Sequence, residues 1–130
     1  MTVRDDMYLL LRVAEWTERN RRHAMRTIRE LAGSEENYLI IARELERVKA
    51  NIIRARTLRA EASLTLVEWL SILDAYQWKC AYCKEKPFEV MHHIVPLPEG
   101  GTNCSNCLPS CHSCSNRSRK KPSAQPPQTT

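Results

Sequence analysis

The chain has 130 residues, which allows one ordinary domain or a small domain with an appended helical element. Its formal net charge of +5, from 20 Lys and Arg against 15 Asp and Glu, moderately favours a polyanionic partner. The sequence contains no run of about 18 apolar residues and no signal-peptide pattern, so a soluble, cytoplasmic protein without a membrane span is expected.

Two series of apolar or small residues at helical spacing dominate the N-terminal half. The first lies in residues 3–31 and has one gap, at Arg21; its members are Met7, Leu10, Ala14, Thr17, Ala24, Ile28 and Leu31. The second consists of Tyr38, Ile41, Leu45, Val48, Ile52 and Ala55. Between them, Gly33 suits a left-handed helix end and Ser34 suits an N-cap. Residues 1–62 are therefore predicted to form an antiparallel hairpin of two long helices.

The remaining surface of the predicted hairpin is densely charged. Residues 1–64 hold thirteen basic and ten acidic side chains, and pairs such as Glu15 and Arg19 are typical of an exposed helix surface. Two interpretations stay open: solvated or oligomer-forming helices, and helices that contact the backbone of DNA. Spare apolar residues favour a homodimer through these helices; they are Leu9, Leu11, Val13 and Trp16.

A third helix is predicted to begin at Thr65. The segment Thr65-Leu66-Val67-Glu68 has the form of a capping box, in which Thr65 caps the helix and Glu68 reaches back. The apolar face of this helix consists of Leu66, Trp69, Leu70, Leu73 and Tyr76. The helix leads directly to Cys80 and is assigned to the module that follows. Beyond that module, residues 122–130 are polar and Pro-rich and are predicted to be a disordered tail.

All six cysteines lie in the C-terminal half, as three pairs with identical Cys-x-x-Cys spacing. The pairs are Cys80/Cys83, Cys104/Cys107 and Cys111/Cys114. Six cysteines in a small secreted domain form disulfides, whereas Cys-x-x-Cys is the spacing with which a loop presents two thiolates to one zinc ion. Because no secretion signal is present, the pattern favours zinc over disulfides.

Further motifs follow in a fixed order around the cysteine pairs. They are His92-His93, Pro96, Gly100-Gly101, Asn106, and Ser115-Asn116 directly after Cys114. Together with the first and last cysteine pairs, this order resembles the HNH endonuclease family over Thr65 to about Lys121. The resemblance implies a ββα-metal fold for residues 63–121, and a chain that is mainly α with a small α+β module.

A structural zinc ion (Zn²⁺) is expected in this module. Its four ligands are Cys80, Cys83, Cys111 and Cys114, and four thiolates leave no open position for water. The remaining pair, Cys104/Cys107, departs from the family pattern. Cys107 is interpreted as a buried small hydrophobe, and a second or alternative metal site at Cys104 and Cys107 is the other interpretation.

The two adjacent histidines are the candidates for catalysis. His93 is expected to be the general base, because a neutral imidazole near pH 7 can take a proton from water. His92 lies on the opposite face of an extended strand. By resemblance, His92 binds the catalytic metal, either magnesium (Mg²⁺), manganese (Mn²⁺) or another divalent ion such as nickel. Asn106 matches the asparagine that braces the loop and orients the base in the family.

The helix after the last cysteine pair departs from the family pattern. Ser115 stands where the family has Asn or His, and Asn116 follows it. Asn116 is chosen as the second metal ligand, with His112 in reserve, although one step along a helix rotates a side chain by about 100°. Basic residues at the end of this helix are expected to contact DNA phosphates: Arg117, Arg119, Lys120 and Lys121.

These features predict a metal-dependent endonuclease that nicks DNA or cuts both strands. The alternative is a catalytically silent, zinc-stapled DNA-binding module, which the serine at position 115 keeps open. A third interpretation makes the helical hairpin the functional part, as a dimerisation or partner-binding element. No pattern for sequence-specific DNA recognition is present.

Overall fold

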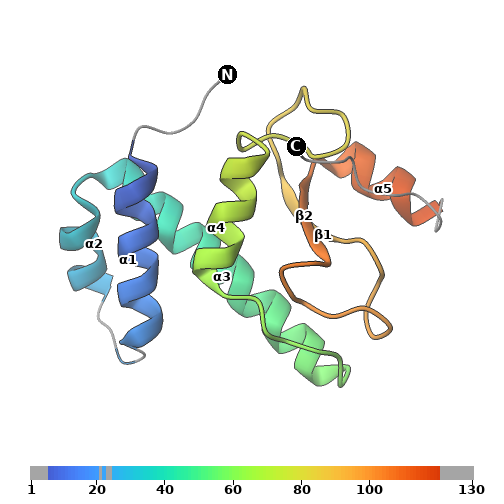
Figure 1. Ribbon diagram of the computed structural model, residues 1–130, viewed down its shortest axis with the longest axis horizontal. Helices are drawn as coiled ribbons and strands as arrows, with labels where there is room; N and C mark the ends of the chain where they lie inside the picture. Colours follow the sequence, from blue (N-terminus) through green and yellow to red (C-terminus); the bar gives the residue numbers. More distant parts are fainter. Residues whose placement is uncertain (1–5, 21, 23–24, 121–130) are drawn as a thin grey trace.

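The described part of the chain is mainly helical with one small antiparallel sheet, as predicted (Figure 1). The computed structural model describes residues 6–20, 22 and 25–120, with side chains up to Arg117. The elements are α1 (Met7–Arg19), α2 (Met25–Ala32), α3 (Glu35–Thr57), α4 (Leu66–Ala75), β1 (Val90–His93), β2 (Cys107–Ser110) and α5 (His112–Lys120). None of these described helices has the length and apolar character needed to cross a membrane.

The prediction of one long helix over residues 3–31 is wrong, because α1 and α2 divide that segment. α1 ends at Arg19, because the next residue, Asn20, leaves the helical conformation and hydrogen-bonds to carbonyls in the last turn of the helix. The Asn20 side-chain amide donates to the Trp16 carbonyl at 2.7 Å, and the Asn20 backbone N–H donates to the same oxygen at 3.1 Å. Asparagine competes with the helical backbone in this way. Three helices in mutual contact therefore replace the expected two-helix hairpin.

The helix caps predicted from the sequence are confirmed. Gly33 has a φ of +81°, the left-handed conformation that glycine tolerates after a helix. The Ser34 hydroxyl accepts a hydrogen bond from the Asn37 backbone N–H at 3.1 Å at the start of α3. At the start of α4, the Thr65 hydroxyl accepts from the Glu68 N–H at 3.1 Å, and the Glu68 carboxylate accepts from the Thr65 N–H at 2.9 Å. At α4 the Glu18 carboxylate of α1 also accepts from the Leu66 N–H at 2.9 Å, so this start combines a local cap with a contact from a distant segment.

One hydrophobic core joins the helices to the sheet. α4 contacts α1, α3 and β2, and so lies between the N-terminal helices and the sheet (Figure 1). The core includes Leu10, Ile28, Ile41, Trp69, Leu73, Met91 and Cys107. Burial raises the pKa of Cys107 to about 12, so this residue is a neutral thiol that packs as a small apolar group. Cys104, the other cysteine of this Cys-x-x-Cys pair, is exposed.

The same core takes up part of the apolar surface that was expected to bind a second chain. Val13 is buried in the core, and Leu11 and Trp16 are partly buried against it. The prediction of spare apolar surface is therefore wrong for Val13. Leu9 is exposed, as is the neighbouring Tyr8, and a homodimer through the N-terminal helices stays a prediction.

A buried carboxylate ties α3 to α4 and to the approach to β1. Glu44 is only 5% exposed. Its Oε1 accepts hydrogen bonds from Trp69 Nε1 at 2.9 Å and from Arg47 Nε at 2.8 Å. The Arg47 guanidinium also donates to the Glu89 carbonyl at 3.0 Å and lies over the ring of Phe88. This network fixes α3 against the rest of the molecule.

We expect Glu44→Ala to lower the free energy of unfolding by about 2–3 kcal/mol, because it leaves the buried Trp69 Nε1–H and the Arg47 Nε–H without their acceptor. Urea denaturation followed by tryptophan fluorescence measures the change. Glu46→Ala is the matched control, since Glu46 is exposed on the same helix, and its effect should stay within about 0.5 kcal/mol. Equal stabilities of the two variants would contradict this role for Glu44.

Candidate active site and metal centre

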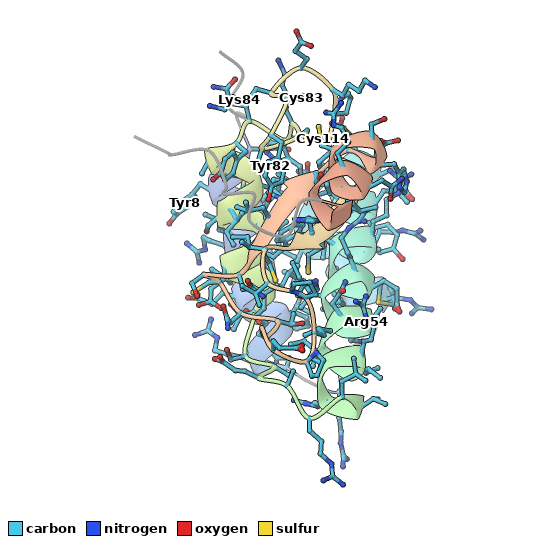
Figure 2. All side chains as sticks on the ribbon, turned by 90° about the vertical axis from the view of Figure 1, so that its right-hand side faces the viewer. Tyr8, Arg54, Tyr82, Cys83, Lys84 and Cys114 are labelled. Carbon is cyan, nitrogen blue, oxygen red and sulfur yellow. The ribbon has the colours of Figure 1, made fainter. Side chains whose placement is uncertain are left out.

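Four cysteines from two separate segments meet beside α5. Cys80 and Cys83 lie in the turn that follows α4, Cys111 follows β2, and Cys114 lies in the first turn of α5. Their four sulfur atoms all lie within 4.8 Å of one another. Tetrahedral zinc with Zn–S bonds of about 2.3 Å requires sulfur separations of about 3.8 Å, so a small contraction makes a zinc site. Figure 2 shows Cys83 and Cys114 near each other at one end of the molecule.

The thiols of this cluster do not ionise alike. Burial opposes ionisation of Cys80, but backbone N–H groups of Cys83, Cys111 and Tyr82 outweigh it and lower the pKa of Cys80 to about 6. Burial and the neighbouring thiols instead raise the pKa of Cys114 to about 12. Four adjacent thiolates repel one another, and a divalent cation removes that repulsion. The donor set therefore fits a structural zinc ion, and none of the six cysteines forms a disulfide.

The basic residues of α5 are only partly described. Arg117 was expected to contact DNA; its guanidinium donates to Cys114 Sγ at 3.0 Å, which places it over the cysteine cluster. The side chains of Arg119 and Lys120, and the whole of Lys121, lie outside the described residues.

The two-stranded sheet connects the cysteine cluster to the histidines. β1 pairs antiparallel with β2, with His92 opposite Leu108 and His93 opposite Cys107. Adjacent strand residues point to opposite faces, and accordingly His92 contacts Ser115 on α5 while His93 contacts Thr102. Both histidines line one cleft of about 470 Å³. The cleft is bounded by Arg54, Met91, His92, His93, Ile94, Pro96, Leu97 and Ser115.

His93 is held by a chain of hydrogen bonds that starts on α3. Its Nε2 lies 2.9 Å from the Thr102 hydroxyl, which lies 3.3 Å from the backbone carbonyl of Asn51. A carbonyl only accepts, so when the hydroxyl donates to it, Nε2 carries the ring proton and Nδ1 holds the lone pair. Burial, followed by the charges of Arg54 and His92, lowers the pKa of His93 to about 4. His93 is therefore a neutral imidazole at pH 7.

On the α5 side, His92 has Ser115 as its partner. His92 Nδ1 lies 3.1 Å from the Ser115 hydroxyl, and Tyr82 makes an edge-on contact with the His92 ring. Asn116 and His112 are exposed and do not line the cleft. The structure thus brings Ser115 to His92, where the sequence-based choice was Asn116. Cys111, Cys114 and Ser115 are buried at helical spacing, and this spacing puts Ser115 on the inner face of α5.

Asn106 braces the loop between the two strands, as expected from the sequence. Its side-chain amide donates to the carbonyls of Val95 and Gly101 at 2.9 and 2.8 Å, and its side-chain oxygen accepts from the Val95 N–H at 2.9 Å. A Cβ at Gly100 would lie 2.2 Å from the Val95 carbonyl oxygen, so this turn requires glycine. Asn106 acts on the loop that follows His93, and no direct hydrogen bond between the two side chains is among the described contacts.

Two residues of the site were not identified in the sequence analysis. Arg54 lies on α3 and Thr102 lies in the loop before β2, yet both reach the histidines. Each contact joins residues that are close only after folding. For Thr102, the polar residue directly after Gly100-Gly101 was the available hint.

Comparison of the chain with family models, with characterised proteins and with solved structures found no significant match.

Proposed function

We propose that this protein is a metal-dependent endonuclease of the HNH type, which hydrolyses phosphodiester bonds in DNA. The observation that carries the proposal is the cleft in which a buried, neutral His93 lies beside His92. A general base must be unprotonated at the working pH and must be oriented by a fixed partner. His93 meets both requirements, because its pKa is low and the Thr102 hydroxyl lies at its Nε2.

The residues divide the reaction between them. His93 Nδ1 takes a proton from the attacking water, whose oxygen forms the new bond to phosphorus while the bond to the 3′ oxygen breaks. His92 would hold the divalent metal, which would neutralise charge on the phosphate and on the departing 3′ oxygen. His92 and the Ser115 hydroxyl, which lie 3.1 Å apart, would offer this metal one imidazole nitrogen and one hydroxyl oxygen. An imidazole ligand favours manganese or nickel over magnesium.

The second candidate function is a catalytically silent, zinc-stapled DNA-binding module. Ser115 supports it, because a hydroxyl that lies 3.1 Å from His92 is a weaker metal donor than the Asn or His expected at that position. The two candidate functions share the zinc site and DNA as the partner. They differ in whether the residues of the cleft hydrolyse a phosphodiester bond.

Supercoiled plasmid separates the two candidates. Purified protein with Mn²⁺, Ni²⁺ or Mg²⁺ should convert the plasmid to the nicked or linear form on a gel, and EDTA should stop the conversion. The EDTA treatment should be kept short, so that the structural zinc stays bound. Excess Mn²⁺ added afterwards should then restore cleavage. Retarded plasmid that stays supercoiled with all three metals would overturn the nuclease and support the silent module. Cleavage that persists in EDTA would overturn the metal dependence.

A further inference from the structure

Arg54 brings a positive charge to the cleft from outside the segment that resembles HNH endonucleases. It lies on α3, is exposed, and lines the cleft together with His92, His93 and Ser115. In Figure 2 it lies beside the sheet, on the side of the molecule that carries α5. Among the described residues, no carboxylate lies within ion-pair distance of Arg54. Its guanidinium therefore forms no ion pair with a carboxylate of the described residues.

The position of Arg54 is fixed by the two turns of α3 that precede it. Arg47 donates to the Glu89 carbonyl at 3.0 Å, and the Asn51 carbonyl lies 3.3 Å from the Thr102 hydroxyl. Residues 47, 51 and 54 lie on one face of a helix, and the first two fasten this face to the approach to β1 and to the support of His93. The third consequently faces the cleft.

We propose that Arg54 binds a non-bridging oxygen of the phosphodiester that occupies this cleft. The residues that line the cleft include no carboxylate to balance the Arg54 cation, and a phosphodiester monoanion supplies that charge. The planar guanidinium is weakly hydrated and presents two parallel N–H groups that match phosphate oxygens. The inference rests on the proposed nuclease function, and it makes α3 one wall of the substrate site.

The kinetic test compares Arg54→Ala, Arg54→Lys and Arg43→Ala in plasmid cleavage. Arg54→Ala should lower kcat/KM by about 10- to 100-fold, because a charge-assisted contact to the reacting phosphate is lost. The Mn²⁺ concentration for half-maximal rate should stay unchanged. Arg54→Lys should be intermediate, since lysine keeps the charge without the fork. Arg43→Ala is the matched control, because Arg43 is exposed on the same helix outside the cleft, and should cleave at the parent rate.

A binding measurement separates this proposal from the proposed function. Met91 lines the cleft, so its ¹³C-labelled methyl group reports on occupancy by dimethyl phosphate, the smallest stable diester. The parent methyl resonance should shift on titration, and the midpoint for Arg54→Ala should rise at least about tenfold. If the parent binds in this way but never cleaves plasmid, the nuclease fails and the phosphate site stands. If the parent cleaves plasmid and Arg54→Ala equals it in kcat/KM and in the methyl titration, the role of Arg54 is overturned.

Discussion

Replacing His93 with alanine should reduce plasmid cleavage by about a hundredfold or more, with the protein still folded and still bound to DNA. The loss follows from removal of the imidazole that is held in the cleft by its contact with the Thr102 hydroxyl. The cysteine cluster does not involve His93, so zinc content and the thermal unfolding midpoint should remain close to those of the parent. Gel-based initial rates and a DNA gel shift measure the two properties.

His112→Ala is the matched histidine control, because His112 is exposed on α5 and does not line the cleft. It should cleave like the parent. The pH dependence gives a second check: the pKa of His93 is about 4, so the ring stays unprotonated well below neutrality. At saturating metal, the acid limb of kcat should therefore lie below pH 6, with activity falling as the pH drops through the pKa. Parent-level cleavage by His93→Ala would refute the assignment of the base.

The second large effect is expected at the cysteine cluster. Cys80→Ser should remove the bound zinc and unfold the sheet and α5, because structural zinc sites contribute on the order of 10 kcal/mol to folding. Elemental analysis of the parent should give about one zinc ion per chain. Circular dichroism and proton NMR spectra should show the loss of the C-terminal structure in the variant.

Cys104→Ser is the control for this experiment. Cys104 is exposed and lies outside the cluster of four, so the variant should keep its zinc and its thermal midpoint. A parent protein that folds without zinc, or that contains disulfides among Cys80, Cys83, Cys111 and Cys114, would contradict the metal centre.

Local features of the fold could be predicted from the sequence, and contacts between distant segments could not. The caps at Ser34 and Thr65 involve residues three positions apart, so the chain shows them directly. The three cysteine pairs share one spacing, and the resemblance to HNH endonucleases indicated which two of them meet. The break after Arg19 was missed because the apolar series resumes after its single gap at Arg21, and hydrophobic periodicity does not reveal the competing hydrogen bond of Asn20.

Within the site, the error over α5 is one of helical phase. A single residue separates Ser115 from Asn116, and about 100° of rotation decides which of them reaches His92. The structure gives that place to Ser115, whose hydroxyl lies 3.1 Å from the ring. Arg54 and Thr102 could not be found in this way, because their contacts to the histidines depend on how α3 and the loop before β2 pack.

Because one hydrophobic core joins the sheet to the N-terminal helices, loss of zinc should also affect the stability of those helices. Cys107 pairs with His93 in the sheet and is buried in the same cluster as Leu10 of α1. α1 packs on α4, and α4 packs on β2, so opening the sheet removes a support of the helix against which α1 lies. Zinc binding and amide protection in α1 are thermodynamically linked, so chelation should speed hydrogen exchange at backbone amides far from any cysteine.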